Sequence, residues 1–414
     1  MTRRIRTRRG ICTAGAALLG IVALAMPTAV SGGPAVAETT TATHAGTSST
    51  APAGVGIPQT IAPGPQERAA ELVADMTTRE QAASVVMGHI STTDPDALRA
   101  YMAQGWGGFI LMGGNIPASD DELRAITAAL GADSELPPLI AIDQEGGIVS
   151  RLSDDDYPAS RTLKSEPVDR TAAAFAARAS LVAQHDITVN FGTVADVTAD
   201  PSSFIYGRAL GTDQTSAAER VAAATVAQER FLASTLKHFP GHGAAPGDSH
   251  HAIPSTDETW EQWRASDAVP FIAGIDAGAS LLMFGHLAYT SVDAAPASLS
   301  ARWHEIARDE LGFEGVIVSD DLGMLQSSGV PAYADPVANA VAALTAGTDL
   351  VLMIAGSTDQ TAGQIADGVT AAVESGALSA DRLADAATRV MALRLQSSAA
   401  GADWGLCEDC EPVG

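Results

Sequence analysis

The chain alternates short apolar runs with longer amphipathic segments, and this alternation occurs eight times. Short apolar runs of this kind have the length of buried β-strands. We expect strands at Ala83–Met87, Gly108–Met112, Leu139–Ile142, Thr188–Phe191, Ser234–His238, Ser280–Phe284, Val316–Ser319 and Asp349–Ile354. Strands that alternate with helices pair in parallel, so eight such units predict an α/β fold that closes into a (β/α)8 TIM barrel. An open, doubly wound sheet is the structural alternative.

The amphipathic segments predict the helices of this fold. Thr77 and Glu80 form a capping box, which is typical of a helix start. The helices expected between the strands are Glu122–Leu130, Ala172–Gln184, Ser216–Phe231, Trp260–Ile275, Arg302–Leu311 and Pro336–Thr345. Two more, Ala362–Glu374 and Ala380–Leu395, follow the last strand and should pack outside the barrel. The pattern predicts one barrel domain over residues 66–396, with extra C-terminal helices.

The first 65 residues differ from the rest in composition. Residues 1–37 combine a basic start, an apolar stretch from Ala14 to Met26 and a run of small residues at 35–37, which predicts a cleavable export signal. The paired arginines of the basic start admit a twin-arginine route, and an uncleaved membrane anchor is the alternative. Residues 38–65 are rich in Thr, Ser, Ala and Pro and predict a linker. We therefore expect a secreted or wall-associated protein with no membrane span after signal removal.

The net charge of the chain indicates which classes of partner it does not bind. The formal net charge is −25, and removing the five arginines of the export signal from the 24 basic residues leaves 19 against 49 acidic ones. Such a surface repels nucleic acid and anionic lipid, so we expect neither as a partner.

Cys407 and Cys410 lie in the tail, residues 397–414. A local disulfide is favoured there in an exported protein, and a zinc site is the alternative.

Charged or titratable side chains end or follow several of the apolar runs. The residues in question are Asp143, Glu145, Lys237, His238, His286, Asp320 and Asp321. The carboxyl ends of barrel strands converge on one face, where the chemistry of such folds is done. So many polar groups at one rim are harder to explain as solvated surface, and we expect the functional site there.

The densest of these segments runs from Lys237 to His251. Lys237 is one of two lysines in a chain that otherwise uses arginine, which indicates that a compact ammonium is wanted. Asp248 and His250 are two residues apart, so in an extended loop the carboxylate can orient the imidazole and make His250 a candidate general acid. Four histidines within these residues also fit a metal cluster.

Two further segments carry acidic residues at strand ends. A carboxylate such as Asp320 or Asp321 can act as a nucleophile toward an anomeric carbon. Neighbours on a strand point to opposite sides, so one of the two acids should face the pocket, and spacing alone does not select it. In the other segment Asp143 can accept hydrogen bonds from sugar hydroxyls and Arg151 can anchor another part of the ligand. Arg208 is a weaker candidate of the same kind.

Taken together, these segments resemble the single-domain β-N-acetylglucosaminidases, or β-N-acetylhexosaminidases, of glycoside hydrolase family 3. The sequence K-H-F-P-G-H-G followed by Asp248-Ser249-His250 is the most specific part, and the Asp143–Arg151 and Ser319–Met324 segments occur in the expected order. The resemblance implies a TIM-barrel, retaining exo-glycosidase that releases terminal β-linked N-acetylglucosamine through a covalent glycosyl-enzyme. It implies no metal or other cofactor.

The resemblance also implies roles for individual residues. Asp320 would be the nucleophile, and His250 the acid/base with Asp248 as its partner. The positions that would hold the terminal sugar are Asp143, Arg151, Arg208, Lys237 and His238. A retaining mechanism fits a separation of about 5–5.5 Å between nucleophile and acid/base, a spacing defined for carboxyl pairs.

The chain differs from the family pattern at a few positions that should affect how the sugar is bound. Many relatives have arginine where this chain has Ile148, and the segment after Arg208 reads Ala-Leu-Gly where Ser-Phe-Gly is usual. Relatives acting on glucosides usually carry a second domain, for which this chain is too short, so the N-acetylglucosamine branch is favoured. Export would direct the enzyme to muropeptides of the cell wall or to chitin-derived oligosaccharides.

Three alternative functions remain at this point. One is a metal-dependent barrel hydrolase built on His238, His242, His250 and Asp320. A second is a non-catalytic protein that binds wall glycans, against which the complete set of acids and histidine argues. The third is a phosphorylase in which phosphate replaces water.

Overall fold

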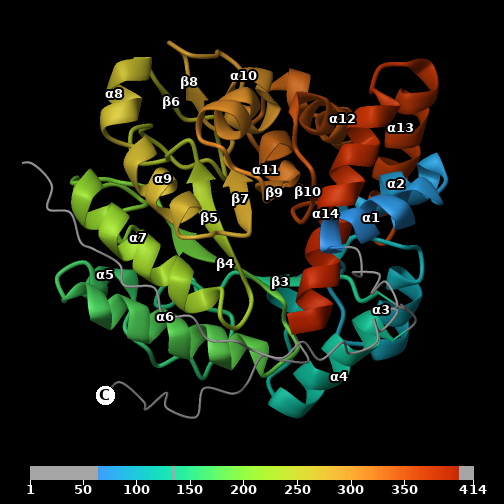
Figure 1. Cartoon of the computed structure of the whole chain (residues 1–414), viewed down its shortest axis with the longest axis horizontal. Coiled ribbons are helices and arrows are strands. Elements are labelled where there is room, and N and C mark those ends of the chain that lie inside the picture. The colour runs from blue at the N-terminus through green and yellow to red at the C-terminus, as the bar shows by residue number, and fades with distance from the viewer. Residues whose placement is uncertain (1–63, 133–135, 401–414) are drawn as a thin grey trace, which may run out of the picture. The chain divides into compact units, whose positions relative to one another are not determined.

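The computed structural model describes residues 64–132 and 136–400, and eight parallel strands form its main sheet (Figure 1). Their order is β10-β1-β2-β3-β4-β5-β7-β9. These strands are β1 (Val86–Gly88), β2 (Gly108–Leu111), β3 (Leu139–Ile142), β4 (Val189–Val194), β5 (Ala233–Phe239), β7 (Leu281–Phe284), β9 (Val316–Ser319) and β10 (Val351–Leu352). The expected export signal, nearly all of the linker and the cysteine pair of the tail lie outside the described residues.

The sheet closes on itself between its first and last strands. Val86 of β1 pairs with Val351 of β10, and a parallel bridge between Val318 and Leu350 joins β9 to the start of β10. The predicted (β/α)8 barrel is thereby confirmed, and the open doubly wound sheet is wrong. All eight predicted strands are present, but the first begins only at Val86 because the preceding residues complete a helix.

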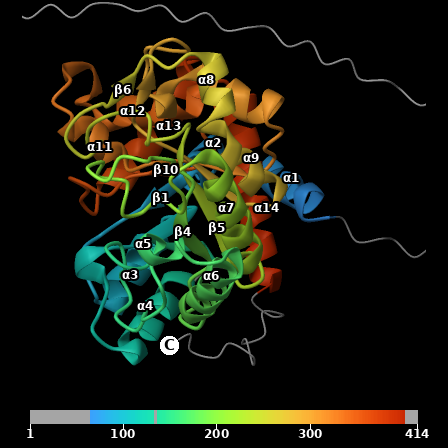
Figure 2. The ribbon, with the colours of Figure 1, turned by 90° about the vertical axis from the view of Figure 1, so that its left-hand side faces the viewer.

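Helices surround the barrel and fill most of the intervals between its strands. They are α1 (Pro65–Ala74), α2 (Thr78–Ser84), α3 (Pro95–Met102), α4 (Asp120–Gly131), α5 (Ser160–Leu163), α6 (Val168–Ala183), α7 (Gln214–Gln228), α8 (Trp260–Ala265), α9 (Ala268–Asp276), α10 (Ala301–Glu305), α11 (Leu322–Ser327), α12 (Pro336–Ala346), α13 (Thr361–Ser375) and α14 (Ala380–Ala400). Figure 2 shows α6 and α7 side by side along one wall. The predicted capping box is present, since Thr77 accepts a hydrogen bond from the Glu80 N–H at the start of α2.

Two predicted helices differ from the structure. The segment expected as one helix over 260–275 is divided into α8 and α9, because the backbone at Ser266 (φ −123°, ψ −87°) leaves the helical region. The segment expected over 302–311 is helical throughout, but its second half, Ile306–Glu310, is a π-helical turn. The structure also contains a small pair of parallel strands, β6 (Ser255–Thr256) and β8 (Ala288–Tyr289), which the sequence pattern did not indicate.

The barrel interior is filled by apolar side chains, as parallel strands covered by helices require. Met87, Ile110, Phe191, Leu281 and Val318 belong to this cluster and are almost fully buried. Helix α14 contributes to the same cluster through Val390 and Leu393, so it completes the core rather than only covering it.

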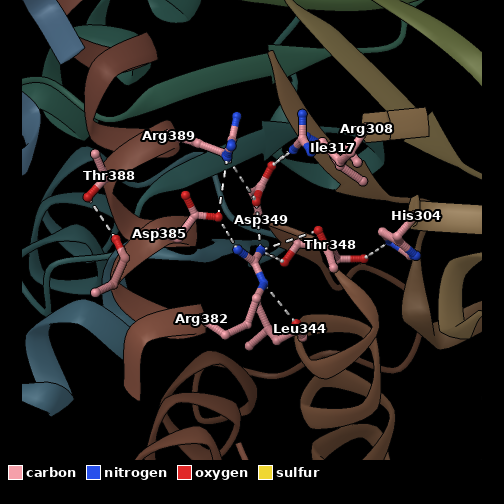
Figure 3. A network of polar contacts seen from close by, with 12 residues as sticks. His304, Arg308, Ile317, Leu344, Thr348, Asp349, Arg382, Asp385, Thr388 and Arg389 are labelled. Carbon is pink, nitrogen blue, oxygen red and sulfur yellow. Dashed lines mark hydrogen bonds and ion pairs between the residues drawn. The ribbon is translucent and has the colours of Figure 1, made fainter. Parts of the chain in front are cut away.

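A buried carboxylate ties the closing strands to the last helix (Figure 3). Asp349, two residues before β10, accepts a 2.9 Å hydrogen bond from the Ile317 N–H of β9 and pairs with Arg308. Its other oxygen lies 2.6 Å from Arg382 of α14, which also binds the half-exposed Asp385. The seam of the barrel is therefore held by charge as well as by the strand pairing.

Among residues 64–132 and 136–400, no helix has the length and apolar character needed to cross a membrane.

Candidate active site

A pocket of about 140 Å³ opens at the carboxyl ends of the barrel strands. Seven of the eight predicted site residues line it, namely Asp143, Arg151, Arg208, Lys237, His238, His250 and Asp320. The eighth, Asp248, is bonded to His250. A larger pocket, of about 390 Å³, lies at the other end of the strands, beside Ile187 and Thr188, and contains none of these groups. The placement agrees with the expectation that polar strand ends meet at one rim.

A buried network of ion pairs forms one side of the pocket. The Lys237 ammonium lies 2.8 Å from Asp143 Oδ1 and 2.7 Å from Glu145 Oε1. Glu145 is also held by both Nε and Nη2 of Arg208, at 2.9 and 2.7 Å. Burial would raise the pKa of Glu145, but the charges of Lys237 and Arg208 outweigh it and lower the pKa to about 2. Glu145 is therefore ionised near neutral pH, held between two cations.

His238 is fixed in orientation by bonds to both ring nitrogens. Nδ1 lies 2.7 Å from Asp196 Oδ2, and Nε2 lies 3.2 Å from Arg208 Nη2. The two contacts fix the orientation of the ring between a carboxylate and a guanidinium. Asp196 also accepts hydrogen bonds from the His238 and His242 N–H groups, at 3.1 and 2.6 Å, and so holds the loop that follows β5. The Lys237–His238 and Phe239–Pro240 peptide bonds in this segment are both cis.

Asp196 and Glu145 are the site residues whose roles the sequence analysis did not assign. Glu145 was recognised as a charged strand-end residue without a function. Asp196 was missed because the fourth strand was expected to end at Phe191, whereas β4 continues to Val194 and places Asp196 just beyond its carboxyl end. A correct strand boundary would have revealed it by the same rule that identified the others.

The two adjacent acids at the end of β9 have different surroundings. Asp321 accepts hydrogen bonds from the N–H groups of Gly323, Ile354 and Ala355, at 2.9, 2.7 and 2.9 Å. It thereby caps α11 and fastens the loop after β10. Burial raises the pKa of Asp321 in spite of these bonds, and neighbouring Asp320 adds to the rise. This side chain is committed to backbone contacts.

Asp320 has one of its oxygens bound to the backbone and lines the pocket. Its Oδ1 accepts the Asp321 N–H at 2.8 Å. Burial would raise the pKa of Asp320, but the imidazoles of His238 and His286, the Asp321 N–H and the Lys237 ammonium outweigh it and lower the pKa. An ionised carboxylate at the inner end of a pocket can attack an electrophilic carbon.

His250 lies on the loop after β5, at the outer side of the same pocket. Its Nδ1 is 2.5 Å from Asp248 Oδ1, and the same carboxylate oxygen accepts the His250 N–H at 3.0 Å. Burial alone would raise the pKa of Asp248, but the two bonds from His250 outweigh it and lower the pKa. The imidazole side chain is 57% exposed, so Nε2 is free to exchange a proton with a ligand or with water.

The four residues of the predicted metal alternative do not form a metal site. Both ring nitrogens of His238 are occupied, and His250 Nδ1 is bound to Asp248. His242 is buried with both ring nitrogens unpartnered, and burial lowers its pKa to about 4. In the part of the chain that the structure describes, no group of three or more His, Cys, Asp or Glu side chains is arranged to hold a metal ion.

The buried carboxyl group of Asp267 lies behind this loop, near the partly exposed Glu258. Tyr289 donates a 2.7 Å hydrogen bond to the Gly241 carbonyl. Gly241 has φ 131°, and a Cβ there would lie 2.8 Å from Asp267 Oδ1. Burial, and then the charge of Glu258, raise the pKa of Asp267 to about 8. Asp267 is therefore largely protonated at neutral pH.

Comparison with known proteins agrees with this geometry. The profile of the glycosyl hydrolase family 3 N terminal domain matches residues 77–393. The chain belongs to glycosyl hydrolase family 3. It is therefore a glycoside hydrolase with the predicted barrel, and the predicted family is confirmed.

Relatives of this family 3 enzyme include several proteins named beta-hexosaminidase. That of Stenotrophomonas maltophilia (strain K279a) is 37% identical over 256 residues, covering 57% of this chain and 72% of the relative. That of Pseudomonas aeruginosa (strain LESB58) is 38% identical over 255 residues, covering 60% and 74%. A family 3 beta-N-acetylglucosaminidase from Paenibacillus sp. str. FPU-7 matches in structure with a TM-score of 0.72 and 29% identity, over 78% of this chain. This family 3 enzyme covers 63% of that protein, just under two thirds of its length.

Proposed function

We propose that this enzyme is a retaining exo-β-N-acetylglucosaminidase that releases terminal β-linked N-acetylglucosamine. The observation that carries the proposal is that the Asp320 carboxylate and the His250 imidazole line one pocket, with the network around Lys237 forming a side of it. The beta-hexosaminidase names of the relatives support the choice of sugar.

In the first step of the proposed reaction, Asp320 attacks the anomeric carbon. A bond forms between a carboxylate oxygen and that carbon, the glycosidic bond breaks, and His250 Nε2 transfers its proton to the departing oxygen. Asp248 accepts the Nδ1–H of the ring, which fixes its orientation and stabilises the imidazolium that gives up the proton. The lowered pKa of Asp320 supports its role, because only the ionised form is nucleophilic.

In the second step, a water molecule replaces the aglycone. His250, now neutral, accepts a proton from the water as the oxygen attacks the anomeric carbon, and the bond to Asp320 breaks. Two displacements at one carbon restore its original configuration, which defines a retaining enzyme.

The side of the pocket formed by the ion pairs offers fixed partners for a terminal sugar. Asp143 keeps 16% of its side chain exposed and lies 3.7 Å from Arg151 Nη2, so both can reach hydroxyl or amide groups of the ligand. The buried Arg151 Nε has no partner in the described residues and is a further donor. Lys237, Arg208 and His238 hold Asp143 and each other in place. A pocket bounded in this way supports attack at a chain end.

Export remains part of the proposal. The predicted signal at residues 1–37 would direct the enzyme outside the cell, as a secreted or wall-associated protein. Its carbohydrate substrates there would be muropeptides or chitin-derived oligosaccharides.

A turnover assay tests the proposal. We expect hydrolysis of an aryl β-N-acetylglucosaminide to exceed that of the matching aryl β-glucoside by orders of magnitude, with β-anomeric product seen first by NMR. First release of the α-anomer would exclude retention. Binding of the glycan without turnover would favour the non-catalytic alternative, and a rate that depends on added phosphate would favour the phosphorylase.

A further inference from the structure

Two cationic side chains beside the pocket have no carboxylate partner. Arg161, in α5, is exposed, and Lys164 follows the same helix. The Lys164 ammonium donates to the Tyr206 carbonyl and lies 3.9 Å from the centroid of the Tyr206 ring. Across the described ranges 64–132 and 136–400, neither cation forms an ion pair with an acid, and the charge that acts on Lys164 is that of Arg161. One ammonium N–H is used, so the others remain to be satisfied by solvent or a ligand.

These cations lie next to residues that line the pocket. Ile148 occupies the tip of a tight turn bridged between Gly146 and Val149, and 75% of it is exposed. A Cβ on Gly207 would lie 3.6 Å from Ile148 Cδ1 and 4.0 Å from Arg161 Nε, so the two loops meet there. Val149 and Arg208, the next residues along these loops, line the pocket itself. The group is therefore at the pocket's edge.

We call Ile148, Arg161, Lys164 and Tyr206 the basic rim. The basic rim carries two positive charges, whereas the chain as a whole has a net charge of −25. Burial, and then the like charge of Arg161, lower the pKa of Lys164 to about 8, so the two cations oppose each other in the unliganded enzyme. A bound anion would relieve that repulsion. Ile148 and the Tyr206 ring add apolar surface of the kind that packs against the face of a sugar ring.

We propose that the basic rim is an aglycone site that selects substrates whose leaving group carries a carboxylate. The inference rests on the proposed function, since it needs a terminal sugar in the pocket and a leaving group that extends past Val149 and Arg208. A carboxylate on the leaving sugar itself and one on an attached peptide share this chemistry.

The test uses two aryl β-N-acetylglucosaminides that differ only in a meta-carboxylate or a meta-carboxamide. We compare the ratio of their kcat/KM values in the wild type, in Arg161→Gln/Lys164→Gln and in Arg230→Gln. Arg230 is exposed just beyond the end of α7, so its substitution removes a positive charge away from the rim. Both substrates are measured with the same variant, so an effect of the substitution on folding or on the chemical step changes both kcat/KM values alike and leaves their ratio unchanged.

We expect the double variant to lower the carboxylate-to-carboxamide ratio about 3- to 10-fold, as loss of two partly exposed charge contacts implies. The Arg230→Gln ratio and the carboxamide rate of all variants should stay at the wild-type level, and 0.5 M salt should reduce the wild-type ratio. An unchanged ratio in the double variant, with both substrates turned over, would overturn the inference and leave the proposed function intact. Failure of the wild type to hydrolyse either substrate would instead count against the proposed function.

A second set of substrates separates the two sources of the carboxylate. N-acetylglucosamine linked to a sugar with a free lactyl carboxylate is compared with its methyl ester and with a form whose lactyl group is amide-linked to a peptide. Loss of preference in both modified forms assigns the rim to the sugar carboxylate. Preference restored by the peptide assigns it to peptide carboxylates, and equal rates for all three contradict the inference.

Discussion

Asp320 and Asp321 are neighbours in sequence and differ in what binds them. Asp321 accepts three backbone N–H groups, one from the first turn of α11 and two from the loop after β10, whereas Asp320 accepts one and lines the pocket. We predict that Asp320→Ala lowers kcat/KM at least about a thousand-fold with little change in unfolding. Asp321→Ala should lower the free energy of unfolding by about 2–4 kcal/mol, because three backbone donors, one buried and two partly buried, lose their acceptor. Steady-state kinetics and urea denaturation of both variants measure this. Equal loss of activity in two stable variants would mean that the nucleophile is assigned wrongly.

His250 is exposed enough to meet an aglycone, and Asp248 orients it. We predict that His250→Ala loses about 10²–10⁴-fold in rate on substrates with poor leaving groups, the usual size of a general-acid contribution. The loss should be much smaller for aryl glycosides whose phenol has a low pKa, since that oxygen departs without a proton. The measurement is the slope of log kcat/KM against leaving-group pKa. A slope identical to that of the wild type contradicts the assignment.

The raised pKa of Asp267 predicts that the stability of the folded protein falls as the pH rises. Its folded-state pKa of about 8 lies above the ordinary value of 3.8, so its contribution to stability is fully present below about pH 4 and is lost as pH rises through about 8. Asp267→Asn keeps the shape without the charge. We predict that this variant gains stability relative to the wild type between pH 4 and 8, by up to about 5 kcal/mol.

Denaturation midpoints measured across that range provide the check. Glu261→Gln, at an exposed site in α8, is the control and should leave the pH dependence unchanged. Parallel curves for wild type and Asp267→Asn would show that Asp267 titrates normally.

At the level of single residues, the sequence predicted which groups meet but not every contact among them. All eight predicted residues are in or beside the pocket, because each lies in the last residues of a strand, follows a strand or belongs to the loop beyond it. The choice of Asp320 over Asp321 needed the resemblance, since spacing says only that the two face different ways. Asp196 escaped because a short extension of β4 cannot be read from hydrophobic pattern.

Among the secondary-structure elements, the strands were better predicted than the helices. Parallel strands buried on both faces are short apolar runs with clear limits, whereas the break at Ser266 falls inside a continuous helical pattern and no Gly or Pro marks it. The π-helical turn at Ile306–Glu310 and the two-residue strands β6 and β8 depend on contacts made far along the chain. No local pattern specifies such features.

The seam between β9 and β10 provides a prediction for an element. Asp349 is 1% exposed, accepts a hydrogen bond from the Ile317 N–H and forms ion pairs with Arg308 and Arg382 (Figure 3). We predict that Asp349→Ala lowers the free energy of unfolding by about 3 kcal/mol, since its removal leaves the buried Ile317 N–H and two partly buried guanidinium groups without their carboxylate partner. Asp385→Ala breaks an exposed pair with the same arginine and should cost less than about 1 kcal/mol. Chemical denaturation of both variants measures the difference, and equal effects would contradict a special role for the seam.

Across the whole molecule, composition and alternation were sufficient for the fold class. Eight repeats of strand and helix leave few topologies, and closure follows when the eighth strand meets the first. The substrate of the enzyme does not follow from the barrel, because many activities share it. The substrate is instead selected by the segments that follow the strands, where Asp320, His250 and the basic rim are found.

The pairing of Val86 with Val351 has a consequence for how this protein is made. A chain emerging from the ribosome exposes its first barrel strand long before the partner that completes it has been synthesised. Strand β1 can pair with β2 early, but its other edge has no partner strand until translation reaches β10, and contacts of such long sequence separation form slowly. Nascent chains halted before Val351 should therefore depend on chaperones, and those released after α14 should not.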